Sequence, residues 1–183
     1  REGRGDKIDV ICEEGTLSYA QLHESVNRVA NGLGEFDVPP GGRVLILLPD
    51  CVEFAAAYLG TVKSGAVAVL TNTALRAPDY AYFLDESEAS VLIVDGGLWP
   101  EVEPILEERP KLRHVVVRGT DRGRARGWEE WVRAQSSSFD PADTSRDDIA
   151  FWLWTSGSTG PPKATPHRHR DWNYCAEYVG HGV

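Results

Sequence analysis

Residues 155–163 read Thr-Ser-Gly-Ser-Thr-Gly-Pro-Pro-Lys and directly follow the apolar run Ile-Ala-Phe-Trp-Leu-Trp at 149–154. The apolar run is typical of a buried strand, and the residues after it are typical of a loop. Glycines let a backbone approach a ligand closely, while hydroxyls, backbone N–H groups and a lysine can bind phosphate oxygens. The pattern therefore predicts a strand that leads into a nucleotide-phosphate loop.

The candidate binding residues are seven members of this loop: Thr155, Ser156, Gly157, Ser158, Thr159, Gly160 and Lys163. Lys163 supplies a compact positive charge, and the two prolines before it stiffen the exit of the loop. The P-loop of kinases and GTPases, G-x-x-x-x-G-K-[ST], does not fit. In this chain the lysine follows a proline, and Ala164 stands where a Ser or Thr should bind magnesium. The remaining alternative is a Gly/Ser/Pro linker that carries a lysine.

The loop is similar to the phosphate loop of the adenylate-forming, or AMP-binding, enzymes, whose pattern is [ST]-S-G-[ST]-T-G-x-P-K. Residues 17–22 (LSYAQL) and 59–72 (LGTVKSGAVAVLTN) resemble two earlier segments of that superfamily, in the same order. In physical terms the first is a helix start, because Ser18 and Gln21 can form a capping box. The second is a helix end at Gly65 followed by a short buried strand. The resemblance implies the N-terminal part of the large adenylate-forming domain.

Within the superfamily, residues 72–87 (NTALRAPDYAYFLDES) and 167–172 (HRHRDW) resemble runs in benzoate-type aryl-CoA ligases. This resemblance implies ATP-dependent conversion of a benzoate-like carboxylic acid to an acyl-adenylate and then to an acyl-CoA. ATP, Mg²⁺ and coenzyme A are the implied cofactors and cosubstrates. Activation of a fatty acid, or of an amino acid for peptide synthesis, stays open, as does a non-catalytic nucleotide-binding remnant. No residue is nominated as catalytic or as a metal ligand.

Some features depart from the family pattern. Ala164 replaces the usual glycine, and Pro166 lacks a backbone donor, so we expect the path that leaves the loop to differ. His169 is interpreted as a histidine at a helix start, although the family often has one there. The acidic residue, ribose-binding aspartate and C-terminal lysine implied by the family have no counterpart in the chain. We therefore expect residues 1–183 to be an N-terminal fragment without the later subdomain and C-terminal domain, and inactive by itself.

Composition excludes some functions. The 19 basic and 28 acidic residues give a net charge of −9, which argues against nucleic acid as a partner. The chain has no apolar run near the ~20 residues of a membrane-spanning helix. Its three widely spaced cysteines suggest no disulfide framework and favour reduced thiols in a cytoplasmic enzyme. The small carboxylic acid expected as its partner is implied by the family resemblance alone.

The hydrophobic pattern alternates between strands and helices. Strands are predicted at 43–48, 66–70, 91–94, 115–117 and 149–154, and helices at 18–34, 49–62, 78–86, 100–108 and 128–132. Residues 136–146 are polar and are the best candidate for a linker. Repeated βα units predict an α/β fold with a mostly parallel sheet. Because ligands of such sheets bind beyond the carboxyl ends of the strands, the loop at 155–163 is expected at that edge.

Overall fold

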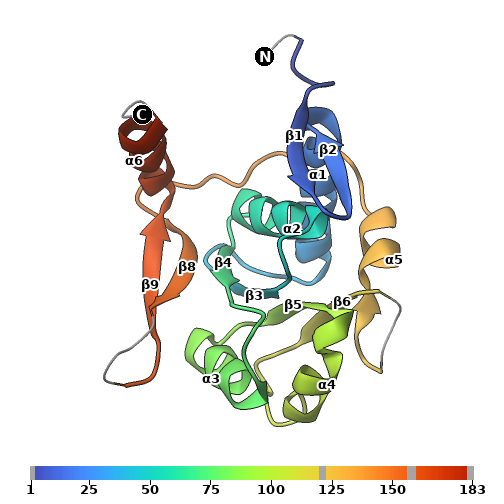
Figure 1. Cartoon of the computed structure of the whole chain (residues 1–183), viewed down its shortest axis with the longest axis vertical. Coiled ribbons are helices and arrows are strands. Elements are labelled where there is room, and N and C mark those ends of the chain that lie inside the picture. The colour runs from blue at the N-terminus through green and yellow to red at the C-terminus, as the bar shows by residue number, and fades with distance from the viewer. Residues whose placement is uncertain (1–2, 120–122, 156–159, 181–183) are drawn as a thin grey trace.

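The computed structural model of the chain describes residues 3–119, 123–155 and 160–180. Among these residues one sheet has the strand order β7-β6-β5-β3-β4-β8-β9 (Figure 1). Its strands are β3 (Arg43–Leu47), β4 (Val67–Leu70), β5 (Val91–Asp95), β6 (His114–Arg118), β7 (Arg126–Gly127), β8 (Ile149–Thr155) and β9 (Lys163–Arg168). Every neighbouring pair is parallel except β8 and β9. The predicted α/β class with a mostly parallel sheet is confirmed.

Helices cover both faces of the sheet (Figure 1). One face packs against α1 (Tyr19–Glu35), α2 (Val52–Lys63) and α5 (Trp128–Arg133), and the other against α3 (Ala77–Ser87) and α4 (Trp99–Val102). Short 3-10 turns, η1 (Gly96–Leu98) and η2 (Glu103–Ile105), flank α4. An antiparallel hairpin of β1 (Ile8–Cys12) and β2 (Gly15–Ser18) precedes α1, and α6 (His169–Gly180) follows β9. No helix of the described residues has the length and apolar character needed to cross a membrane.

Strand β3 is buried on both faces. Val44 and Ile46 belong to the core under α1 and α2, whereas Leu45 and Leu47 belong to the core over α3 and α4. All four side chains have no exposed surface. This burial explains the near-continuous apolar run at 43–48, because a parallel strand covered by helices on both sides has no polar face.

Two predicted helix signals are confirmed at the atomic level. The Ser18 hydroxyl accepts a hydrogen bond from the Gln21 N–H at 3.3 Å, and the Gln21 side chain accepts one from the Ser18 N–H at 2.9 Å. This capping box begins α1. Gly65 ends α2 with a φ of 80°, and its N–H donates to the Val62 carbonyl at 3.1 Å. A glycine suits that left-handed position because it has no Cβ.

Two predicted helix ends are wrong. Helix α1 continues through Gly34 to Glu35, and the left-handed residue that follows it is Asp37, with a φ of 52°. The predicted helix at 100–108 is only the short α4, which passes into η2 after Val102. Pro104 explains this early end, because proline has no N–H for the helix and its ring clashes with the preceding turn.

Residues 136–146 contain no helix or strand. They pack against the first two helices, where the Asn31 side-chain amide donates to the carbonyls of Ser136 and Ser138, both at 2.9 Å. The Ala142 N–H donates to the carbonyl of Lys63 at 3.1 Å. These contacts hold the segment along α1 and α2, and its role as a linker between two units stays a prediction.

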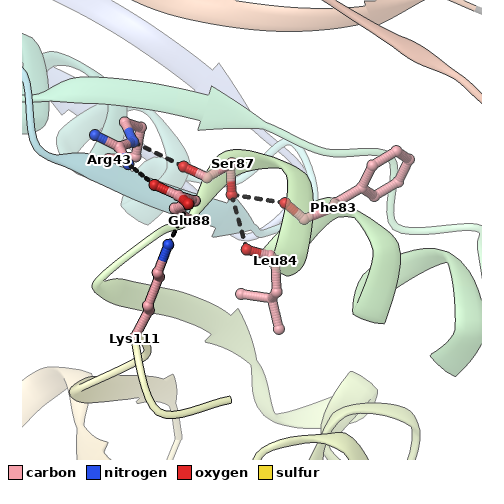
Figure 2. Close-up of polar contacts among 6 residues, drawn as sticks. All are labelled: Arg43, Phe83, Leu84, Ser87, Glu88 and Lys111. Carbon is pink, nitrogen blue, oxygen red and sulfur yellow. Dashed lines mark hydrogen bonds and ion pairs between the residues drawn. The ribbon is translucent and has the colours of Figure 1, made fainter. Parts of the chain in front are cut away.

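The end of α3 is tied to the amino edge of the sheet (Figure 2). Arg43 of β3 donates from Nε to the carbonyl of Ser87 at 2.7 Å and forms an ion pair with Glu88 at 3.2 Å. Lys111, in the segment before β6, forms a second ion pair with Glu88. The Ser87 hydroxyl donates to the carbonyl of Phe83 at 2.6 Å, one turn back in the helix. The helix thus has a fixed end on the side opposite the carboxyl ends of the strands.

Helices α1 and α2 meet closely at Gly60. A Cβ atom built on Gly60 would lie 2.6 Å from the Val29 Cβ and 3.0 Å from the Val26 carbonyl oxygen. We therefore expect Gly60→Ala in the intact protein to cost about 1–3 kcal/mol of stability through overpacking. Gly34→Ala is the matched control, because a Cβ there meets nothing within 4 Å. Alanine should stabilise that helix by about 0.5–1 kcal/mol. Thermal unfolding tests both, and equal shifts in Tm would contradict this packing.

His114 makes stability depend on pH. Its ring stacks on Phe36 with centroids 4.2 Å apart, and burial is the largest cause that lowers its pKa below the usual 6.5. Below pH 6.5 the unfolded chain binds a proton that the folded chain does not, so this contribution is complete above 6.5 and is lost as the pH falls. We expect His114→Phe to show a smaller fall in Tm than the wild type between pH 7 and pH 5.5. Parallel falls would exclude this role for His114.

Candidate functional site

The hairpin of β8 and β9 positions the predicted phosphate loop. Strand β8 lies parallel to β4, with Ala68 opposite Phe151 and Val69 opposite Trp152. Strand β9 then returns antiparallel to β8, and its register places Thr155 opposite Lys163. The loop therefore starts at the carboxyl end of a parallel strand, which is the edge where ligands of such sheets bind.

The structure describes three of the seven predicted site residues. Thr155 ends β8, Gly160 is exposed, and Lys163 begins β9. The other four lie outside the described residues: Ser156, Gly157, Ser158 and Thr159. The Thr155 hydroxyl donates to the carbonyl of Lys163 at 3.3 Å, so this hydroxyl closes the base of the hairpin.

Lys163 is the cation of this site. It is exposed, and its ammonium forms no ion pair with any side chain of the described residues. Its backbone, in contrast, is held in the ladder between β8 and β9. A lysine with a fixed backbone and an unpaired charge can bind an anion without first breaking an ion pair.

A hollow of about 660 Å³ lies next to the hairpin. Its walls come from the segments that follow β3 and β4, from the ends of α2 and β4, and from Leu153 and Trp154 of β8. The Trp154 Nε1 and the Thr71 hydroxyl, both in residues that line the hollow, are buried and have no hydrogen-bond partner among the described residues. The hollow lies at the carboxyl edge of the sheet and is lined by both apolar and polar residues.

Helix α3 contacts strand β8 and the residue that precedes β9, next to the loop. The ring of Trp154 packs on Phe83, with centroids 4.3 Å apart, and lies 6.2 Å from the ring of Tyr82. The Tyr82 hydroxyl donates to the carbonyl of Pro162 at 2.9 Å. Sequence reasoning did not identify Tyr82, because nothing in its helical segment marks a contact with a residue 80 positions away.

The same helix holds the loop that follows β4. The Tyr80 hydroxyl donates to the carbonyl of Thr73 at 3.0 Å and accepts a hydrogen bond from the Leu75 N–H at 3.2 Å. Tyr80 is only 1% exposed, and its burial is the largest cause that raises its pKa. The hydroxyl therefore stays protonated and remains a donor. Two segments that line or border the hollow are thus attached to one helix.

The residues after the loop form regular structure. Pro166 lies in β9, the edge strand of the described sheet, opposite Trp152. Proline is tolerated at an edge because no further strand requires its missing N–H, so the chain continues as a strand despite the departure from the family pattern. His169 begins α6, as the helix-start interpretation predicts. Across the described ranges, no three His, Cys, Asp or Glu side chains come together as a metal site.

Comparison with known proteins identifies the family. A family model described as AMP-binding enzyme matches residues 1–181. The benzoate–CoA ligase of Thauera aromatica is 38% identical over 180 residues, which cover 96% of this chain and 33% of the ligase. The long-chain-fatty-acid–CoA ligase FadD13 of Mycobacterium tuberculosis is 33% identical over 153 residues, which cover 84% of this chain and 30% of that ligase.

Solved structures show the same relationship. The crystal structure of the anthranilate CoA ligase AuaEII in complex with anthranoyl-AMP superimposes with a TM-score of 0.94 at 34% identity, over 98% of this chain and 35% of that one. The chain thus spans about a third of the length of the relatives it matches. With the family model matching nearly its whole length, this chain belongs to the AMP-binding enzyme family.

Proposed function

We propose that the loop at 155–163 binds the β- and γ-phosphates of ATP, in a protein that activates a benzoate-like carboxylic acid and transfers it to coenzyme A. The observation that carries the proposal is the state of Lys163. Its backbone is fixed at the carboxyl edge of the sheet, where the Thr155 hydroxyl bonds its carbonyl, while its ammonium has no ion-pair partner among the described residues. Such an unpaired cation can neutralise phosphate charge.

The proposed reaction has two steps. A carboxylate oxygen of the acid attacks the α-phosphorus of ATP, and the bond from that phosphorus to the pyrophosphate breaks. The sulfur of coenzyme A then attacks the acyl carbon of the adenylate, and AMP leaves. Negative charge grows on the departing pyrophosphate in the first step, so Lys163 would act by electrostatic stabilisation and by positioning. None of the described residues is assigned a proton-transfer role.

Magnesium and coenzyme A enter the proposal through the family. The chain carries a net charge of −9, and ATP adds further negative charge, so a divalent cation fits the need for neutralisation. The loop fits phosphate because it combines glycines, hydroxyls and Lys163 at a strand end. The described residues contain no three-residue cluster suited to a metal ion. We therefore assign no residue of this chain to magnesium or to coenzyme A.

The relatives favour an aromatic acid. The benzoate–CoA ligase named above is 38% identical to this chain, and the structure that superimposes with a TM-score of 0.94 is an anthranilate CoA ligase. A long-chain fatty acid is the second candidate, because a ligase with that name is 33% identical over 84% of the chain. Its lower coverage makes it the weaker of the two. The hollow beside the hairpin has a mixed apolar and polar lining that does not discriminate between the two acids.

Lys163→Ala in the intact protein tests the phosphate loop. Loss of one charge-assisted hydrogen bond should cost about 1.5–3 kcal/mol, which lowers kcat/KM for ATP about 10- to 150-fold. Release of pyrophosphate in the presence of the acid measures this effect. Lys111→Ala is the control, because Lys111 is an exposed lysine whose partner Glu88 lies at the opposite edge of the sheet (Figure 2). Unchanged adenylation kinetics in Lys163→Ala would remove the basis for the assignment.

A panel of acids tests the substrate class. With ATP, magnesium and coenzyme A present, we expect benzoate, 4-hydroxybenzoate or 2-aminobenzoate to give a kcat/KM at least about tenfold above that of a long-chain fatty acid, a difference of about 1.4 kcal/mol. The measurement is formation of the thioester by the intact protein. Preference for the fatty acid would replace the aryl assignment with the second candidate. Binding of ATP without turnover of any acid would favour a non-catalytic nucleotide-binding protein.

A further inference from the structure

One tyrosine joins helix α3 to the residue before Lys163. The Tyr82 hydroxyl donates to the carbonyl of Pro162 at 2.9 Å, although the two residues are 80 positions apart in the sequence. Pro162 directly precedes Lys163, so the accepting carbonyl belongs to the peptide group that carries the lysine nitrogen. This single hydrogen bond therefore fixes the backbone on the amino side of Lys163.

The carbonyl side of Lys163 is held as well. The Thr155 hydroxyl donates to its carbonyl at 3.3 Å, and the ladder between β8 and β9 begins at this pair. Lys163 thus has a hydrogen bond to each of its two flanking peptide groups, one from β8 and one from α3. The exposed side chain forms no ion pair among the described residues. These backbone contacts therefore determine the position of the Cα atom from which the side chain and its ammonium extend.

The ring of Tyr82 contacts the opposite strand of the hairpin. It lies 6.2 Å from the ring of Trp154, between centroids, and meets Phe83 edge-on at 5.7 Å. One side chain therefore touches β8 with its ring and the residue before β9 with its hydroxyl. Replacement by phenylalanine removes the hydroxyl and leaves the ring contacts in place, which separates the two roles.

Helix α3 is a firm support for this contact. Its last turn is held by Arg43 through Ser87 and Glu88 (Figure 2). At its first turn, the Ala77 N–H donates to the carboxylate of Glu101 at 3.0 Å, and that contact is the largest cause that lowers the pKa of Glu101. A helix that is fixed at both ends can hold the group that it binds in a defined position.

We propose that Tyr82 is a positioning residue, whose hydroxyl places Lys163 for the phosphates of ATP through the carbonyl of Pro162. This role rests on the proposed function of the loop. Electrostatic stabilisation requires the cation to be in place before charge develops, and small displacements reduce it. Loss of one neutral hydrogen bond in Tyr82→Phe should lower kcat/KM for ATP about 3- to 10-fold. The KM for the acid should change less than about twofold, because no contact to the acid is assigned to Tyr82.

A double-mutant cycle in the intact protein tests this proposal. The variants are Tyr82→Phe, Lys163→Ala and the pair together, each measured by pyrophosphate release at varied ATP and varied acid. Because Tyr82 acts through the lysine, Tyr82→Phe should have less than about a twofold effect when Lys163 is already alanine. Ser87→Ala is the matched control, since it removes a side-chain hydrogen bond from the same helix at the far edge of the sheet (Figure 2). It should leave kcat/KM for ATP within about twofold of the wild type, and Tm is recorded for every variant.

Each other outcome overturns the proposal in a distinguishable way. If Lys163→Ala impairs ATP kinetics while Tyr82→Phe matches the wild type, the loop keeps its function and the positioning role is rejected. A full effect of Tyr82→Phe in the absence of the lysine rejects action through Lys163. A loss in Ser87→Ala equal to that in Tyr82→Phe, with equal shifts in Tm, reduces the role to support of the helix. Normal ATP kinetics in Lys163→Ala reject both the phosphate loop and this proposal.

Discussion

The parallel pairing of β4 with β8 is the constraint on which the candidate site depends. It places Phe151 opposite Ala68, so residues more than 80 positions apart lie side by side on adjacent strands. From that pairing, β8 carries the loop to the carboxyl edge, where the segments after β3 and β4 also begin. The interior of the sheet supports this arrangement, because residues 44–47 of β3 are buried between two layers of helices. The site is therefore a product of the sheet and not of the loop alone.

Helix α3 joins this edge to the rest of the molecule. Its first half presents Tyr80 to the segment after β4 and Tyr82 to the residue before β9. Its last turn is bound to the start of β3 at the opposite edge. One helix thus contacts both the amino and the carboxyl edge of the sheet. Its two tyrosines, two positions apart, form hydrogen bonds to two different segments. The backbone of Lys163 is consequently held by a hydrogen bond on each side, while its ammonium has no ion-pair partner among the described residues.

Much of the fold follows from local signals in the sequence. Apolar runs such as that at 43–48 predict buried parallel strands, and Gly65 predicts a helix end, because these features depend on burial and on backbone conformation alone. The helix at 100–108 is predicted too long because its apolar spacing continues past Pro104, which ends the helix. Strand β9 is not predictable from its residues, since Lys-Ala-Thr-Pro-His-Arg has no apolar alternation and pairs only because the hairpin brings it to β8.

The candidate site likewise has a part that the sequence predicts and a part that only the structure shows. The loop residues and their chemistry are evident from the pattern at 155–163, whereas Tyr82 is evident only from its packing against Trp154 and Pro162.

The most direct test of the phosphate loop is a crystal structure of the intact protein with magnesium and a non-hydrolysable ATP analogue. We expect the terminal phosphate oxygens within hydrogen-bonding distance, roughly 2.7–3.2 Å, of the Lys163 ammonium and of donors in the loop at 155–163. We also expect the hydrogen bond from Tyr82 to Pro162 to persist. A triphosphate bound elsewhere, with the Lys163 ammonium in solvent, would contradict the proposed function.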